Sequence, residues 1–111
     1  MKVNLQDIPT EMTHNNTTFR KRLITVEEKK GRIATSNYAR LTKGSQLEPH
    51  AHTDGEEFYL FLEGSGEMLV GEEWMSVGKG DFVTVPKNAV HSIKNTLDEN
   101  LVFLTIRTIS D

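Results

Sequence analysis

Cysteine is absent from the 111 residues of the sequence. Disulfide bonds and thiolate metal ligands are therefore excluded, so any bound metal must be held by nitrogen and oxygen atoms. Long apolar runs are missing too, because no stretch approaches the roughly 20 residues of a membrane-spanning helix and residues 1–12 lack the apolar core of a signal peptide. We therefore expect a cytoplasmic protein without a membrane partner.

Basic residues are too few for a nucleic-acid surface. The sequence has 13 lysines and arginines against 16 aspartates and glutamates, which gives a net charge of -3 and a pI near 5.8. Binding to nucleic acid needs clustered basic residues, so we expect no nucleic-acid partner. Hydrophobic residues at 36% and charged residues at 26% are typical of a globular protein, and the length suits one domain with a real core.

Sustained helical periodicity is also missing, whereas short apolar alternations bounded by turn residues recur about every eight to twelve residues. This spacing is typical of an all-β sandwich or barrel, and antiparallel strands in two sheets of jelly-roll order are the expected architecture. Residues 1–18 are polar and predict an extended N-terminal arm, which leaves residues 19–111 as one barrel domain. The expected strands are 19–26, 32–41, 57–62, 67–70, 74–77, 82–85, 91–93 and 101–109.

A stretch near the middle of the chain concentrates residues that bind metals. His50 and His52 lie one residue apart, and both would point the same way from an extended strand. Asp54 and Gly55 predict a tight reversal, after which a returning strand would bring Glu57 back beside the histidines. The expected product is a site with two imidazole nitrogens and one carboxylate.

A second stretch supplies another imidazole. Residues 80–95 read as a strand, a turn that begins at Pro86, and then His91 at the start of a further apolar alternation. A third histidine could therefore reach the site from a separate hairpin. Two such stretches together are a stronger indication of a metal site than either one alone.

The two stretches fit a pair of spaced motifs of a known protein family. The fitting positions are Gly44, His50, His52, Glu57 and Gly64, followed by Gly80, Pro86, His91 and Asn95. On these nine positions the chain, from about residue 19 to residue 109, resembles a small single-domain cupin. One departure is Asn88, which stands where the family usually has glycine. Asparagine also tolerates a left-handed turn conformation, so the departure does not weaken the resemblance.

The resemblance implies a double-stranded β-helix, which is the jelly-roll barrel of the cupins. It also implies one divalent metal ion held by His50, His52, Glu57 and His91. Three imidazoles and one carboxylate suit iron, manganese, nickel, cobalt, copper or zinc, whereas calcium and magnesium prefer more oxygen ligands. Glu56 is the alternative carboxylate, and Glu57 is favoured because it lies in the family's register.

Other residues near the motifs are candidates for a pocket wall. Tyr59 and Phe61 share the predicted inward face with Glu57. Ile93 and Arg40 complete the expected wall, although strand parity alone does not fix whether Arg40 points inward. The sequence shows no second acid and base pair, and the nearest candidates for proton transfer are Glu56 and Tyr59.

Two surfaces are expected from charge and hydrophobicity. The run from Arg20 to Arg22 is interpreted as a solvated strand edge, with an anion site as the alternative. The strand at 57–62 is apolar on both faces, since Phe58 and Leu60 would face outward while Tyr59 faces inward. Such a strand must be covered on its second side, which favours a homodimer, with the N-terminal arm as another candidate cover.

The resemblance and the ligand set leave two classes of function open. The first is a metal-dependent enzyme that acts on a small oxygen-bearing molecule as an oxygenase, an isomerase or a lyase. The second is a non-catalytic module that binds or senses a small molecule in the same metal pocket. One barrel supports many chemistries, so the fold alone does not choose between them.

Overall fold

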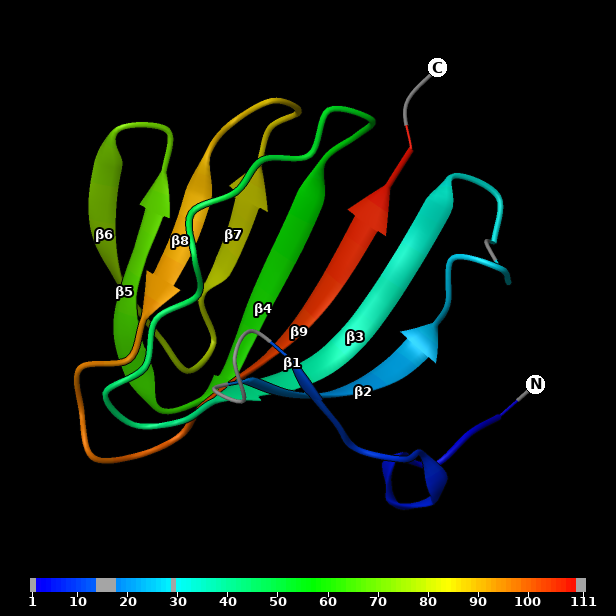
Figure 1. Cartoon of the computed structure of the whole chain (residues 1–111), viewed down its shortest axis with the longest axis horizontal. Coiled ribbons are helices and arrows are strands. Elements are labelled where there is room, and N and C mark those ends of the chain that lie inside the picture. Colours follow the sequence, from blue (N-terminus) through cyan, green and yellow to red (C-terminus); the bar gives the residue numbers. More distant parts are fainter. Residues whose placement is uncertain (1, 14–17, 29, 110–111) are drawn as a thin grey trace.

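The computed structural model describes residues 2–13, 18–28 and 30–109. These residues form a 3-10 turn, η1 (Leu5–Asp7), and nine strands, and the strands make two antiparallel sheets (Figure 1). The larger sheet has the order β1-β2-β3-β9-β4-β7 and the smaller one the order β6-β5-β8, which confirms the predicted all-β jelly roll. The bounds are β1 Glu11–Thr13, β2 Thr18–Ile24, β3 Ile33–Leu41, β4 Glu57–Glu63, β5 Ser65–Val70, β6 Glu73–Gly78, β7 Phe82–Val85, β8 His91–Lys94 and β9 Leu101–Thr108.

The alternation of side chains along β4 separates a core face from an outer face. Glu57, Tyr59 and Phe61 are buried, whereas Phe58 and Leu60 are only half-buried, as the strand pattern predicts. The inward row continues onto β9, where aromatic and aliphatic side chains close the core. The core residues are Ala39, Leu41, Leu47, Tyr59, Phe61, Met68, Val77, Val85, Ile93, Leu101 and Phe103. Glu57 opens β4 and therefore lies at the end of this buried row.

The loop between β3 and β4 runs along the smaller sheet, in front of β8 in Figure 1. Its backbone pairs with β8 at two points, with bridges between Gln46 and Lys94 and between His50 and His91. The Leu47 amide also donates to the Ile93 carbonyl over 2.9 Å. The loop therefore extends the smaller sheet by a short irregular strand, and this pairing fixes the position of His50.

The predicted hairpin around Asp54 and Gly55 is wrong in its pairing. The chain does bend at residues 53–55, but β4 then pairs with β7 and β9 and not with the segment that carries His50 and His52. Each edge of a strand inside a sheet needs a backbone partner, and β7 and β9 supply long ones for the two edges of β4. The short histidine segment cannot supply such an edge, so it pairs with β8.

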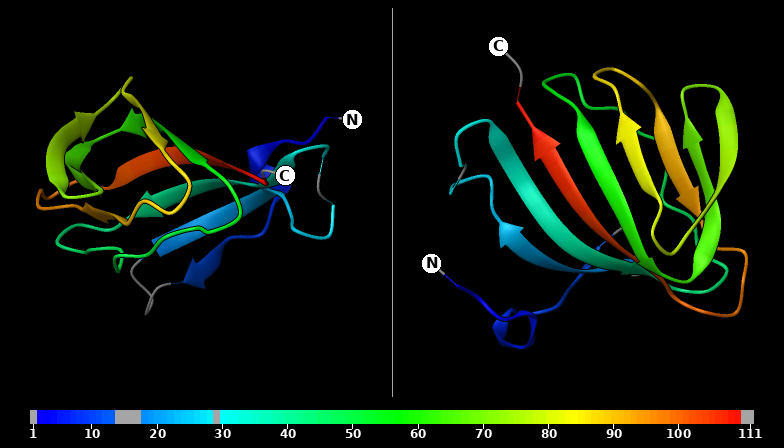
Figure 2. Two further views of the ribbon diagram at one scale, coloured as in Figure 1. Left: turned by 90° about the horizontal axis from the view of Figure 1, so that it is seen from above. Right: turned by 180° about the vertical axis from the view of Figure 1, so that it is seen from behind.

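The N-terminal arm is less extended than the sequence suggests. Of residues 1–18, positions 1 and 14–17 lie outside the described residues. The rest contains η1 and the short strand β1, which pairs with β2 of its own chain, so that Glu11 lies opposite Arg20. Both views in Figure 2 place this segment at the end of the larger sheet away from β5 and β6. In the described ranges, no helix is long and apolar enough to span a membrane.

Candidate metal centre

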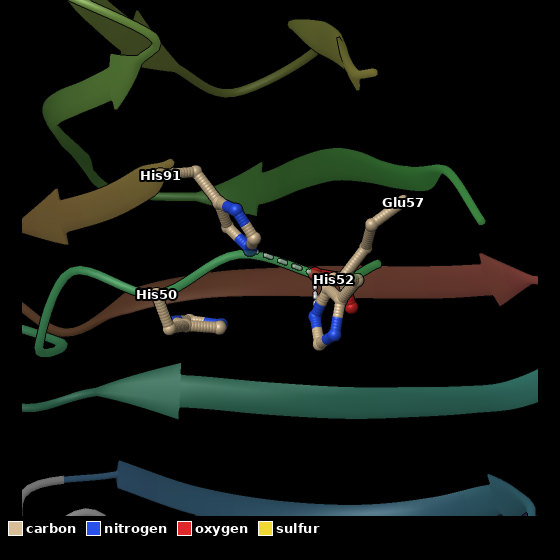
Figure 3. Close-up of side chains that lie close together, drawn as sticks. All are labelled: His50, His52, Glu57 and His91. Carbon is tan, nitrogen blue, oxygen red and sulfur yellow. Dashed lines mark hydrogen bonds and ion pairs between the residues drawn. The ribbon is translucent and has the colours of Figure 1, made fainter. Parts of the chain in front are cut away.

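Four side chains from three parts of the chain converge at one end of the barrel (Figure 3). His50 and His52 come from the β3–β4 loop, Glu57 from the start of β4, and His91 from the start of β8. One ligand atom from each residue can be chosen so that all four lie within 4.8 Å of one another. The structure therefore brings together the four residues that the two motifs single out, and the group could hold one metal ion.

Backbone pairing explains why the three histidines meet. The amides and carbonyls of His50 and His91 exchange two hydrogen bonds of 3.0 and 2.8 Å, and the ring centroids lie 4.2 Å apart. The His52 carbonyl accepts a 2.8 Å hydrogen bond from the amide of Asn88. Asn88 has a φ of 71°, so it adopts the left-handed turn conformation for which the family uses glycine.

Backbone carbonyls fix the tautomers of two of the imidazoles. Nδ1 of His50 lies 2.8 Å from the Glu48 carbonyl oxygen, and Nδ1 of His91 lies 3.2 Å from the Ala89 carbonyl oxygen. A carbonyl oxygen only accepts, so each Nδ1 carries the hydrogen and each Nε2 is left with a lone pair. Burial lowers the pKa of His50, against the opposing effect of the Glu48 hydrogen bond, and so favours the neutral form that binds metals.

Glu57 is a buried carboxylate in contact with two imidazoles and one hydroxyl group. Burial by itself would raise the pKa of this carboxyl, but contacts with His52, His91 and Tyr59 outweigh burial and lower it to about 2. Oε1 lies 3.2 Å from Nε2 of His52 and 3.1 Å from Nε2 of His91, and the Tyr59 hydroxyl donates to it over 2.8 Å. Because Nδ1 of His91 carries a hydrogen, neutral His91 would present a lone pair to this anion. A cation between them resolves the conflict, so the donor set fits a divalent metal ion.

Tyr59 orients the carboxylate, since its buried hydroxyl donates to Glu57 Oε1. Burial, followed by the neighbouring negative charge of Glu57, raises the pKa of Tyr59 well above its usual value, so the hydroxyl keeps its proton. We expect Tyr59→Phe to weaken Co²⁺ binding about 10-fold or more, which is typical when a partner of a metal ligand is lost. A competition titration against a chromophoric chelator measures the change.

Tyr38→Phe is the matched control for this variant, because Tyr38 is half-buried on β3 and lies outside the cavity beside the four ligands. It should bind Co²⁺ like the parent. Equal affinities in all three proteins would show that the Tyr59 hydroxyl does not support the site.

A cavity of about 360 Å³ opens beside the four residues. Of the expected wall, Tyr59 lines it, whereas Phe61 and Ile93 are wholly buried in the core and do not. Arg40, which was also expected in the pocket wall, does not line the cavity. Ala39 points inward, so Arg40 points outward, where its guanidinium lies 4.2 Å from the centre of the Phe19 ring. Glu56 is exposed and absent from the lining, so it is not placed for proton transfer in the cavity.

Much of the remaining lining is polar, and the sequence interpretation overlooked most of it. Arg20 and Arg22 of β2 line the cavity, whereas Lys21 between them does not. Side chains alternate between the two faces of a strand, and this alternation could have identified Arg20 and Arg22 as the two inward residues of the basic run. Arg107 was missed as well; it lies opposite Glu57 in the register and donates two 2.9 Å hydrogen bonds to Asp54.

Comparison with known proteins shows partial matches to curated sequences. A family model described as "Cupin domain" matches residues 37–107, which include both motif stretches. A glucose-6-phosphate isomerase from Thermococcus kodakarensis is 40% identical over 62 residues, which are 51% of this chain and 33% of that protein. An acireductone dioxygenase from Leptospira biflexa is 38% identical over 66 residues, which are 56% of this chain and 36% of that protein. The chain thus spans only about a third of the length of these two relatives.

Solved structures match over nearly the whole chain. A protein described as a predicted oxalate decarboxylase from Thermotoga maritima has a TM-score of 0.91 at 23% identity, over 99% of this chain and 100% of its own. A polyketide cyclase from Streptomyces resistomycificus has a TM-score of 0.83 at 20% identity, over 99% of this chain and 80% of its own. At these identities, the likeness establishes the shared fold.

Proposed function

The chain belongs to the cupin domain family, and from this membership we propose that it is a divalent-metal protein that acts on a small oxygen-bearing metabolite. The observation that carries the proposal is the group of three imidazoles and one carboxylate, with ligand atoms within 4.8 Å of one another beside a cavity. A transition metal held by His50, His52, Glu57 and His91 would supply Lewis-acid polarisation of a substrate oxygen. Oxygenase, isomerase and lyase chemistry all use such polarisation.

The residues around the four ligands orient them and leave room for a small substrate. Carbonyl groups orient the imidazoles of His50 and His91, and Tyr59 orients the carboxylate of Glu57. Burial keeps Tyr59 protonated, so it acts as a donor and not as a base. The cavity of about 360 Å³ falls in the lower part of the range for small-molecule pockets, which suits a metabolite with few heavy atoms.

The curated relatives support a reaction on an oxygen-bearing substrate, since one is named an isomerase and another a dioxygenase. A second candidate function, a non-catalytic module that binds or senses a small molecule, is favoured by the composition of the cavity wall. Among the residues described as lining the cavity, the only carboxylate is Glu57, which belongs to the metal group. A separate general base is therefore not evident in the wall.

Turnover distinguishes the two functions. We would first identify the metal in protein purified without an affinity tag. Iron, nickel or copper directs the next step to oxygen-consumption assays with enolic and keto substrates, and manganese or zinc to isomerase and lyase screens. Metal-dependent product formation by the parent supports the enzyme, whereas stoichiometric binding of the same compounds without turnover supports the module.

We also propose a homodimer formed through the outer face of β4 and β7. Phe58 stacks on Phe82 with ring centroids 5.9 Å apart, and 62% of Phe82 is exposed on β7, an edge strand of the larger sheet. Half-buried Leu60 lies opposite Phe82 in the register, so the apolar patch spans both strands. A second copy of the chain would bury a patch of this kind.

Phe82→Glu should convert the dimer to a monomer, because a charge would then be buried in the apolar contact. Light scattering coupled to size exclusion measures the mass. Leu97→Glu places the same charge on an exposed leucine outside the strands and should leave the mass unchanged. A Phe82→Glu protein with the same mass as the parent would exclude this face as the interface.

A further inference from the structure

Three guanidinium groups line the cavity beside the metal centre. Arg20 and Arg22 reach it from β2, and Arg107 reaches it from β9. Such a concentration of positive charge is unexpected in a chain with a net charge of -3. The pairing of each guanidinium shows which of them is available to a ligand.

Two of the three arginines already hold carboxylates. Arg107 donates from Nη1 to both carboxylate oxygens of Asp54 at 2.9 Å. Arg22 grips Glu11 of β1 with two contacts, 2.7 Å from Nε to Oε1 and 3.0 Å from Nη2 to Oε2. This forked arrangement is the geometry in which arginine recognises a carboxylate or a phosphate.

Arg20 differs from the other two arginines, because it makes no hydrogen bond to either carboxylate. Its Nη2 is 3.7 Å from Glu11 Oε2, which is an ion pair but too long for a hydrogen bond. Its Nε is buried and has no hydrogen-bond partner. The inward neighbour of Arg20 on β3 is Ala39, whose small side chain leaves space over the sheet for a guanidinium. Arg20 therefore presents unused donor capacity to the cavity.

Two threonine hydroxyls in the lining of the same cavity also lack partners. Thr18 and Thr105 are 3% and 5% exposed, and neither Oγ1 makes a hydrogen bond. Both residues line the cavity. In the described part of the chain, the buried side-chain polar atoms without a partner are these two hydroxyls and Arg20 Nε. Buried polar groups normally have partners, so three unpartnered atoms on residues that line one cavity point to a ligand that carries oxygen atoms.

We propose that the part of the cavity lining made by Thr18, Arg20 and Thr105, called here the oxyanion wall, binds an anionic substrate, whose charged oxygen group is held by Arg20. A carboxylate and a phosphate share the required chemistry, because each accepts from a guanidinium and from hydroxyls. The inference rests on the proposed function and narrows the substrate to a small organic anion whose other end lies at the histidines. The neighbouring Arg22 already binds the carboxylate of Glu11, a residue that does not line the cavity.

Calorimetric titration of the metal-replete protein with succinate tests the proposal, and succinamide serves as the uncharged probe of similar shape. Arg20→Gln should weaken succinate binding at least about 10-fold, the effect typical of losing a hydrogen bond to a charged group. Arg40→Gln removes the same charge from the outer face of the adjacent strand, so its succinate affinity should equal that of the parent. Succinamide should bind all three proteins alike.

A second variant has the opposite expected sign. Glu11 competes with the ligand for the guanidinium groups of Arg22 and Arg20. Glu11→Gln should therefore tighten succinate binding by about 3-fold or more. A variant that gains affinity cannot be explained by misfolding. Thermal unfolding of each variant shows whether the fold is retained.

The outcomes separate the oxyanion wall from the metal proposal. Equal succinate affinity in the parent, Arg20→Gln and Arg40→Gln would overturn the wall, even in a protein with stoichiometric metal. If the protein binds no divalent metal but its succinate affinity still depends on Arg20, the wall is supported and the proposed function is contradicted. Titration with inorganic phosphate in place of succinate identifies the preferred anion, because the group that the wall prefers should lose more affinity in Arg20→Gln.

Discussion

Replacement of His50 and His91 together by alanine should abolish stoichiometric metal binding. The two imidazoles are neighbours in the site, since their ring centroids lie 4.2 Å apart and the backbones of the two residues are joined by two hydrogen bonds. The variant would keep His52 and Glu57, a two-ligand set that leaves the metal open to water on most sides. Loss of one outer partner of a ligand costs about 10- to 100-fold in affinity, so we expect the loss of two ligands to cost at least about 1,000-fold.

Elemental analysis of the purified protein, followed by Co²⁺ titration, measures this loss. The control is His14→Ala, because His14 is the one histidine of the sequence that lies outside both motif stretches. His91 is nearly fully buried, so thermal unfolding must show that the double variant still folds. His50→Ala alone, at a half-buried loop position, provides a milder test. A folded double variant with the metal content of the parent would contradict the assigned ligands.

Gly64→Ala should destabilise the barrel more than any other exchange of glycine for alanine at a turn with positive φ. Gly64 has a φ of +80°, and a Cβ atom there would lie 2.3 Å from the Asn100 carbonyl oxygen. The left-handed conformation costs about 1–2 kcal/mol for a residue with a side chain, and crowding against fixed neighbours typically costs a further 1–3 kcal/mol. We expect a loss of roughly 3 kcal/mol, or a fall in Tm on the order of 10–20 °C.

Gly71→Ala is the matched control for the crowding contribution. Its φ of +68° is similar, but a Cβ atom there would meet nothing within 4 Å. The backbone conformation alone should therefore cost about 1–2 kcal/mol in this variant. Urea unfolding of both variants measures the difference. Equal losses at the two positions would show that the close approach of Asn100 to the turn after β4 does not constrain the fold.

The sequence predicted local features of the fold correctly where they depend on neighbouring residues. The period of two along β4 places Glu57 and Tyr59 on the buried face, and the Asn88 turn adopts the left-handed conformation. The pairing of β4 could not be read in the same way. Its partner β9 begins at Leu101, and the order of strands in a sheet depends on contacts between distant parts of the chain.

The four metal-site residues could be selected from the sequence because the motifs fix their spacing. The rest of the pocket could not be selected so easily. Arg20 and Arg40 are both basic residues in strands. Only the structure shows that the Ala39 side chain is buried on the inner face, so that Arg40 faces away from the cavity. The run of basic residues at the start of β2 is typical of a solvated edge, but the period of two along a strand places Arg20 and Arg22 on one face and Lys21 on the other.

The most direct test of the metal centre is a crystal structure of the untagged protein with anomalous diffraction measured at the absorption edge of the metal that it contains. We expect one anomalous peak at about 2.0–2.2 Å from Nε2 of each of the three histidines and from the Glu57 carboxylate. At least one further coordination position should face the cavity. A metal-containing crystal in which the peak lies away from these four residues would contradict the proposed centre, and with it the function built on it.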